Sequence, residues 1–123
     1  MLDNAYYDFM LNGIVTVDGI SVLNAFHLIP FKAKAYLDLQ SRKRLGEQLD
    51  SKKIKKHKRD ALRLAQLLSG NEAVSLQEPI ALDMRAFISD CKTSPVNLKQ
   101  IGITGASMDD MLATLKQVYV DHP

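Results

Sequence analysis

A lysine within an otherwise apolar helical pattern is the first feature of this sequence that could do chemistry. Lys32 shares a stripe with Leu28, Ala35 and Leu39, at separations of three and four residues. The neighbouring positions are apolar as well, and a helix that is apolar nearly all round is typical of a buried helix. An unpaired ammonium group in such surroundings is very costly, so Lys32 needs water, a carboxylate or an anionic ligand.

Three environments for Lys32 remain open from the sequence. Its end can reach water, it can pair with Asp38 or Asp60, or it can contact a phosphate group of a ligand. Lys34, two residues further on, is predicted to face solvent. The choice matters because only the phosphate contact would make Lys32 a binding residue.

Positive charge is concentrated in the middle of the chain. Residues 32–63 contain twelve Lys and Arg but four Asp and Glu, a net charge of +8, whereas the other residues carry −6 and the whole chain +2. Either the acidic parts neutralise the basic helices and the remaining charges stay solvated, or the segment forms a surface for phosphates. The second interpretation makes the segment a candidate binding site.

Residues suited to catalysis or metal binding do not form a recognisable motif. His57 lies on the apolar side of its predicted helix, with no Cys or second His at metal-ligand spacing, so we expect a structural role. Asp109 and Asp110 fall in the predicted first turn of a helix, where acidic residues favour the helix dipole. The sequence has neither a Gly-rich phosphate loop nor a nucleophile elbow. It therefore predicts no catalytic residue and no metal site.

The elements that must position these residues are mostly helices. Asp18-Gly19 between two β-branched runs predicts a β-hairpin from about Ile14 to Leu23. Its two strands need helices, or strands from elsewhere, to cover them. Helices are predicted over residues 3–11, 29–45, 52–68, 79–91 and 107–119. The expected fold is α+β and predominantly helical, with the hairpin packed on four or five helices in a single domain of residues 1–123.

Polar residues mark several helix starts. Side chains suited to accept hydrogen bonds from unpaired backbone N–H groups stand at Asn24, at Asp50 or Ser51, and at Ser107. Pro30 lacks an N–H group, which is tolerated only in the first turn of a helix. The long helix after the hairpin is therefore expected to begin at Ile29 or Pro30, following a looser turn.

The cellular setting is predicted from the cysteine count and the hydropathy. Cys91 is the single cysteine, so an internal disulfide is impossible, and a lone thiol suits the reducing cytoplasm. The sequence contains neither a long apolar run nor the layout of a signal peptide. We therefore expect a cytoplasmic protein that does not enter a membrane.

The middle of the chain resembles a known family. "ISVL", "NAFHLIPFKAKAYLDL", a basic loop and "KKHKRDALRLAQLL", within residues 12–68, resemble the C-terminal half of the nucleotidyltransferase-like family that includes the abortive-infection toxins. The resemblance implies that Lys32 lies near nucleotide phosphates, and that Arg59 and Asp60 match a basic-acidic pair in which Asp60 helps to hold the lysine.

Two family features are missing from this chain. Arg63 stands where the family has a second acid, and the paired-acid strand motif that holds Mg²⁺ is missing before residue 12. The resemblance therefore implies no catalysis by this chain alone, and a role for Mg²⁺ only if a catalytic domain completes it.

The function expected from these observations is that of a non-catalytic fragment or remnant of a nucleotidyltransferase-like protein. A basic groove would bind a nucleotide or other phosphate ligand. Lys32 would contact the anion, Asp60 would orient Lys32, and the surrounding positive field would come from Lys55, Lys56 and Arg59. The chain would then be the C-terminal portion of a longer protein, which has a further N-terminal domain, or would assemble as a homo-oligomer.

Two other classes of function remain open. A nucleic-acid-binding helical module would use the basic segment from Arg42 to Arg59, although this segment has few aromatic residues for stacking on bases. An assembly partner would complete the sheet of another chain with the strand at Ile14–Val17. An apolar patch left exposed beside the hairpin would favour this last class.

Overall fold

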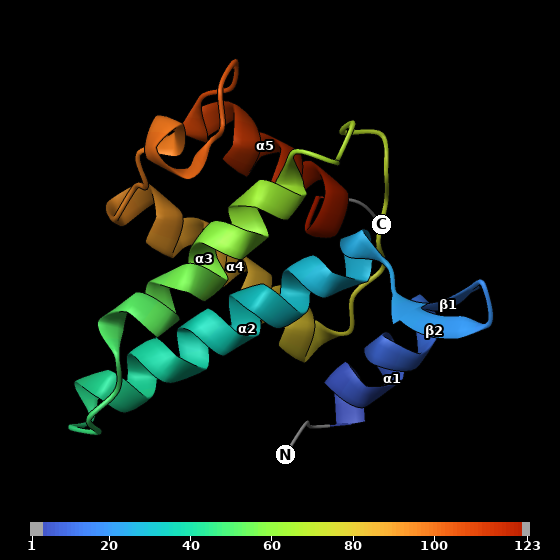
Figure 1. Ribbon diagram of the computed structural model, residues 1–123, viewed down its shortest axis with the longest axis horizontal. Helices are drawn as coiled ribbons and strands as arrows, with labels where there is room; N and C mark the ends of the chain where they lie inside the picture. The colour runs from blue at the N-terminus through green and yellow to red at the C-terminus, as the bar shows by residue number, and fades with distance from the viewer. Residues whose placement is uncertain (1–3, 122–123) are drawn as a thin grey trace.

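The computed structural model describes residues 4–121 and shows a mostly helical α+β fold (Figure 1). The predicted fold class is confirmed, including the hairpin near the N-terminus. The elements in chain order are α1 (Asn4–Gly13), β1 (Ile14–Val17), β2 (Ile20–Leu23), α2 (Ala25–Arg44), α3 (Ser51–Ala65), α4 (Glu78–Thr93), the 3-10 helix η1 (Leu98–Ile101) and α5 (Met108–Tyr119). Asp3, which the sequence placed in the first helix, lies outside the described residues.

Helices α2 and α3 form the central pair of the fold. They run side by side in opposite directions and make the most extensive contact between any two elements (Figure 1). The chain reverses between them at Gly46, whose φ of 102° lies in the left-handed region that favours glycine. Asp50 then starts α3, because its side chain accepts a hydrogen bond from the Lys52 N–H. This helix pair carries most of the basic segment.

The start of α2 differs from the sequence prediction. The helix begins at Ala25 rather than at Ile29 or Pro30, and Asn24 caps it by accepting from the His27 N–H. Pro30 lies inside the helix and cannot donate to the Phe26 carbonyl four residues earlier. The Tyr119 hydroxyl of α5 donates to that carbonyl at 2.5 Å. A tertiary contact thus satisfies the group that the proline leaves without its helical partner, so the helix continues through the proline.

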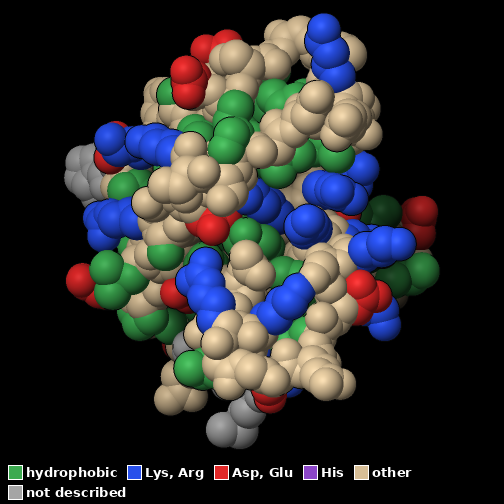
Figure 2. All heavy atoms as spheres, turned by 90° about the vertical axis from the view of Figure 1, so that its left-hand side faces the viewer, with side chains coloured by type: hydrophobic (Ala, Val, Ile, Leu, Met, Phe, Trp, Pro, Cys, Tyr) green, Lys and Arg blue, Asp and Glu red, His purple; other side chains and the backbone are tan. Residues whose placement is uncertain are grey.

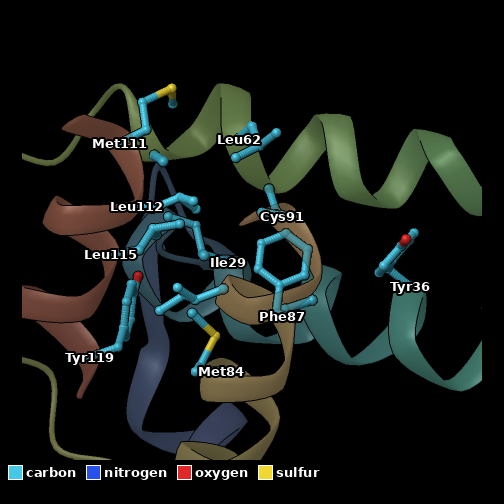
Figure 3. Packing of buried hydrophobic residues seen from close by; sticks show 14 of the residues in the cluster. Ile29, Tyr36, Leu62, Met84, Phe87, Cys91, Met111, Leu112, Leu115 and Tyr119 are labelled. Atoms are coloured by element: carbon cyan, nitrogen blue, oxygen red, sulfur yellow. The ribbon is translucent and has the colours of Figure 1, made fainter. Parts of the chain in front are cut away.

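The main core lies where α2, α3, α4 and α5 meet. Figure 3 shows side chains from all four helices pointing into one cluster. Its fully buried members include Ile29, Leu62, Met84, Phe87 and Leu115. The Tyr36 and Phe87 rings pack edge to face, with centroids 6.0 Å apart. A smaller cluster of Ala5, Tyr6, Phe9 and Ile80 joins α1 to α4.

The hairpin has the predicted turn but is less covered than expected. Asp18 and Gly19 have φ angles of 51° and 79°, as a two-residue turn with two left-handed positions requires. Val15 pairs with Val22 and Val17 with Ile20 across the strands. The sequence required a cover of helices or of strands from elsewhere. Within residues 4–121 the sheet has two strands, and every strand residue except the half-buried Leu23 is exposed.

The remaining helices follow the predicted pattern closely. Pro79 lies in the first turn of α4, and Ser107 caps α5 by accepting from the Asp110 N–H at 3.0 Å. Asn97 caps η1 in the same way. None of the helices in the described part of the chain is long and apolar enough to cross a membrane.

Candidate functional site

Lys32 forms an ion pair between the two central helices. Its Nζ lies 3.2 Å from Oδ2 of Asp60, and the Lys32 side chain is 29% exposed. Asp60 also lies 3.4 Å from Nη1 of Arg63, whose Nε donates to the Ile101 carbonyl. Of the environments that the sequence left open, the structure therefore shows the pair with Asp60. Two cations share this carboxylate, and the Lys32 ammonium is directed to a neighbouring helix.

A different lysine, Lys58, occupies the most buried position of any charged group in the described residues. It is 5% exposed, and its Nζ lies 2.9 Å from Oδ2 of Asp90 and 2.7 Å from the Ser94 carbonyl oxygen. The same ammonium lies 5.2 Å from the centre of the Tyr36 ring. Burial, followed by a hydrogen bond with Asp90, raises the pKa of Tyr36 to about 12.

Sequence reasoning missed Lys58 although a signal was present. The residue lies in the run "KKIKKHKR", and so many charged residues in succession predict a solvent-exposed side of the helix. It nevertheless follows the buried Ile54 by four residues and precedes the buried Leu62 by four. That spacing places all three on one side of α3. A lysine in register with the core side chains of its own helix is therefore a candidate for burial.

Lys34 is also placed differently from the prediction. Its Nζ lies 3.4 Å from Asp38 and 4.0 Å from Asp83, and 4.8 Å from the centre of the Tyr6 ring. The prediction that it faces solvent is wrong, because its side chain is 23% exposed. Asp38 is four residues further along α2, so helical spacing could reveal it, but Asp83 and Tyr6 are supplied by the packing of α4 and α1 against α2.

A polar cavity opens where α2, α3 and the segment after α4 come together. Its volume is about 440 Å³, within the range of small-molecule sites. The lining residues are Tyr36, Gln40, Lys55, Lys58, Arg59, Ser94, Pro95, Val96, Asn97 and Gln100. Two of the predicted site residues, Lys55 and Arg59, are brought together here. None of the lining residues is an Asp or a Glu.

The two exposed cations of this cavity have no partner among the residues that the structure describes. Within residues 4–121, neither Lys55 nor Arg59 forms a salt bridge or a hydrogen bond through its side chain. Lys58, by contrast, is neutralised by Asp90. The cavity therefore has a charged wall of Lys55 and Arg59, which can accept an anion without first breaking an ion pair.

The other predicted site residues lie outside this cavity. Residues 55 and 59 are one helical turn apart on α3, while Lys56 and Asp60 are rotated from them by about 100°. Lys56 is exposed beside His57, and Asp60 is paired with Lys32. The helix thus divides the predicted set between two faces, and Lys32 does not line the cavity.

The surroundings of His57 and Cys91 indicate a structural role for each side chain. Nδ1 of His57 is buried without a hydrogen-bond partner in the described structure. Desolvation, and then the positive charge of Lys32, lowers the pKa of His57. Cys91 is buried, which raises the pKa of its thiol to about 12 and leaves it unreactive. Across residues 4–121, no group of three or more His, Cys, Asp or Glu is arranged to hold a metal ion.

Comparisons with known proteins give no match. Family models, curated proteins and solved structures were each searched, and none of them matches this chain. The resemblance of residues 12–68 to nucleotidyltransferase-like proteins therefore stays a prediction.

Proposed function

We propose that this protein binds a phosphate-bearing small molecule, such as a nucleotide, in the cavity between α2, α3 and the segment after α4. The observation that carries the proposal is the pair of unpartnered cations, Lys55 and Arg59, in a polar cavity with no acidic lining residue. The protein acts as a binding domain and has no catalysis of its own, in keeping with its resemblance to part of a nucleotidyltransferase-like protein.

The two cations suit a phosphate group in complementary ways. The guanidinium of Arg59 can donate two parallel hydrogen bonds to phosphate oxygens, and the Lys55 ammonium adds a mobile point charge one turn away. The Lys58 ammonium beneath them is already paired with Asp90 and holds the wall of the cavity in place. The phosphate would therefore bind at the mouth of the cavity, over α3.

The rest of the lining suits a polar, uncharged portion of a ligand. Gln40, Asn97 and Gln100 bring side-chain amides, which can both donate and accept hydrogen bonds. Gln40 uses its Nε2 to donate to the Tyr36 hydroxyl at 3.3 Å, so its carbonyl oxygen is available as an acceptor. Sugar hydroxyls and base edges offer the matching groups.

In this proposal Lys32 and Asp60 support the site and do not contact the ligand. Their ion pair ties α2 to α3 on the face next to the cavity. The family resemblance would instead direct Lys32 to the phosphate. The cavity lining favours Lys55 and Arg59 for that role, because they are the unpartnered cations.

Isothermal titration calorimetry with a panel of nucleotides, at low salt and with Mg²⁺ present, tests the proposal. At least one nucleotide should give saturable heat, and the double variant Lys55→Ala, Arg59→Ala should weaken its binding by at least tenfold. Lys53→Ala removes one exposed charge from the same helix outside the cavity and should leave binding unchanged. Absence of heat with every nucleotide would remove the basis for the proposal.

A second candidate function, assembly through the hairpin, is favoured by its exposed apolar side chains. Val15, Val17, Ile20 and Val22 lie on one face of the hairpin and are 41–65% exposed. Neither strand carries the Lys, Pro or bulge that often protects a sheet edge. We therefore propose that the hairpin also pairs with that of a second copy.

Sedimentation velocity over a range of protein concentrations tests this second candidate. A dimer should form with rising concentration, and Val17→Lys should abolish it by placing a charge on the apolar face. A wild-type protein that sediments as a monomer at all concentrations would exclude self-assembly through the hairpin.

A further inference from the structure

The cavity does not end at Lys55 but continues along the central helix pair. A second hollow, of about 380 Å³, is lined by Gln40, Lys43, Arg44, Ser51 and Lys55. It shares Gln40 and Lys55 with the first cavity, so the two hollows adjoin. We call this combined feature, from Asn97 to Arg44, the basic groove.

Four exposed cations line the basic groove together with the buried Lys58, and none of the lining residues is acidic. Lys43, Arg44, Lys55 and Arg59 are exposed and alternate with amide and hydroxyl side chains. Lys43 contacts the Ser51 hydroxyl, which holds its ammonium across the turn between α2 and α3. Figure 2 shows Lys and Arg side chains gathered over this end of the molecule.

The length of the basic groove exceeds what one phosphate group needs. Its lining runs along α3 from Ser51 to Arg59. Eight residues of α-helix rise about 12 Å. Successive phosphates of a stacked strand advance about 3.4 Å, so this length matches about three or four nucleotides.

Resting on the function proposed above, we infer that the ligand of the basic groove is the backbone of a single-stranded nucleic acid. The backbone would pass Arg59 and Lys55 and leave over Lys43 and Arg44, with consecutive phosphates neutralised in turn. Gln40, Asn97 and Gln100 would meet sugar or base groups at the wider end. A mononucleotide would fill the wider end alone and leave Lys43 and Arg44 without an anion.

The shape and the aromatic content define the kind of strand. The groove lies between two packed helices, which admits one strand more readily than a rigid duplex. Tyr36 is the only aromatic lining residue of these two hollows, and its ring is buried. Bases therefore have no exposed ring on which to stack, and binding should depend on chain length and salt more than on sequence.

Fluorescence anisotropy with a labelled twelve-residue oligouridylate tests the inference, with uridine monophosphate measured by calorimetry alongside. The oligomer should bind at least tenfold more tightly than the mononucleotide. Four phosphate contacts predict that log K falls with log salt with a slope of about −2.8, since each contact contributes about −0.7 for a single strand.

Variants of Lys43 and Arg44, at the end of the basic groove away from Asn97, separate the inference from the proposed function. Lys43→Gln with Arg44→Gln should weaken oligomer binding several-fold and bring the slope to about −1.4, while leaving mononucleotide binding unchanged. Arg85→Gln with Lys92→Gln, on α4 and outside the groove, is the charge-matched control and should alter neither. Circular dichroism confirms that each variant is folded.

Each other result overturns the inference in a distinct way. Equal affinity for mononucleotide and oligomer would leave the proposed function standing and remove the strand. Equally tight binding of a twelve-base-pair duplex would replace the single strand with a surface contact. Equally effective competition by inorganic polyphosphate, at matched phosphate concentration, would identify a simple polyanion site. Absence of binding by the oligomer and by every nucleotide of the panel would defeat the proposed function as well.

Discussion

Lys58 and Lys32 perform the same task in two different environments. Each lysine extends from one helix to a carboxylate on another, Lys58 to Asp90 of α4 and Lys32 to Asp60 of α3. The side chain of Lys58 is 6% exposed, and it has a carbonyl oxygen and an aromatic ring as further partners. Lys32 is far more exposed, and its carboxylate is shared with Arg63.

The difference shows how burial changes what an ion pair contributes. Removing one partner of a buried pair leaves an uncompensated charge in a poorly solvated place, which is strongly destabilising. Water can reach the partly exposed pair of Lys32 and Asp60, so the loss of one partner costs less. The lysine that matters most for stability is therefore the one that the sequence pattern did not single out.

The largest effect is expected from Lys58→Ala. Asp90 and the Ser94 carbonyl would lose their common donor, and the free energy of unfolding should fall by about 3–5 kcal/mol. Urea denaturation followed by circular dichroism measures the change. Lys55→Ala, three residues earlier and without a partner, should change stability by less than about 0.5 kcal/mol. A loss below about 1 kcal/mol for Lys58→Ala would show that the two ion pairs are equivalent after all.

A double variant sharpens the interpretation of that loss. Lys58→Met with Asp90→Leu replaces the buried pair by apolar side chains of similar length, and should recover most of the stability lost on removing Lys58 alone. Equilibrium denaturation of the two variants side by side makes the comparison. A double variant no more stable than Lys58→Ala would mean that the pair itself, and not the stranded charge, stabilises the contact.

A smaller effect is expected from Lys32→Ala. The ion pair with Asp60 is partly solvated, and Arg63 remains to neutralise the carboxylate. The free energy of unfolding should fall by about 0.5–1 kcal/mol, and the loss should shrink in high salt because exposed charges are screened. Denaturation at two salt concentrations provides the measurement. A loss as large as that of Lys58→Ala would place the critical ion pair between α2 and α3.

The smallest effect is expected in the pH dependence of stability and comes from His57, whose pKa the charge of Lys32 affects. Desolvation first, and then the charge of Lys32, holds the pKa of His57 below its ordinary 6.5. The unfolded chain therefore binds a proton more readily than the folded chain, and stability should fall as the pH drops below about 6.5. His27, whose pKa burial also lowers, acts in the same direction.

The variant His57→Gln isolates the contribution of His57 to this pH dependence. Thermal melts between neutral and mildly acidic pH should show a shallower loss of stability in this variant than in the wild type. Lys32→Ala should also flatten the dependence, because it removes the larger of the two lysine charges that lower the pKa of His57, while Lys56 remains. Identical pH profiles for all three proteins would contradict the assignment to His57.

Local sequence signals predicted the starts and turns of the fold well. Asp18-Gly19 is the hairpin turn, and Asn24, Asp50 and Ser107 cap the helices that follow them. These features depend on residues within a few positions of each other, so the chain itself contains the information. The start of α2 escaped prediction because the group left open by Pro30 is satisfied by Tyr119, far away in the chain.

The candidate site was predicted only in part, for a related reason. The sequence located the basic segment and named Lys55 and Arg59 within it, and both line the cavity. It also grouped them with Lys32, Lys56 and Asp60, which lie on another face of the helix pair. Helical spacing can assign residues to a side of one helix, but it cannot say which side meets a neighbour and which meets a hollow.

The sequence by itself determined the helical character, the hairpin and the concentration of positive charge in residues 32–63. Only the tertiary structure decided which of these charges is buried, which is paired and which is left free beside a cavity. The physical reason is that the energy of a charge depends on its distance from water and from opposite charges. Those distances are fixed when α4 and the segment after it pack against α2 and α3.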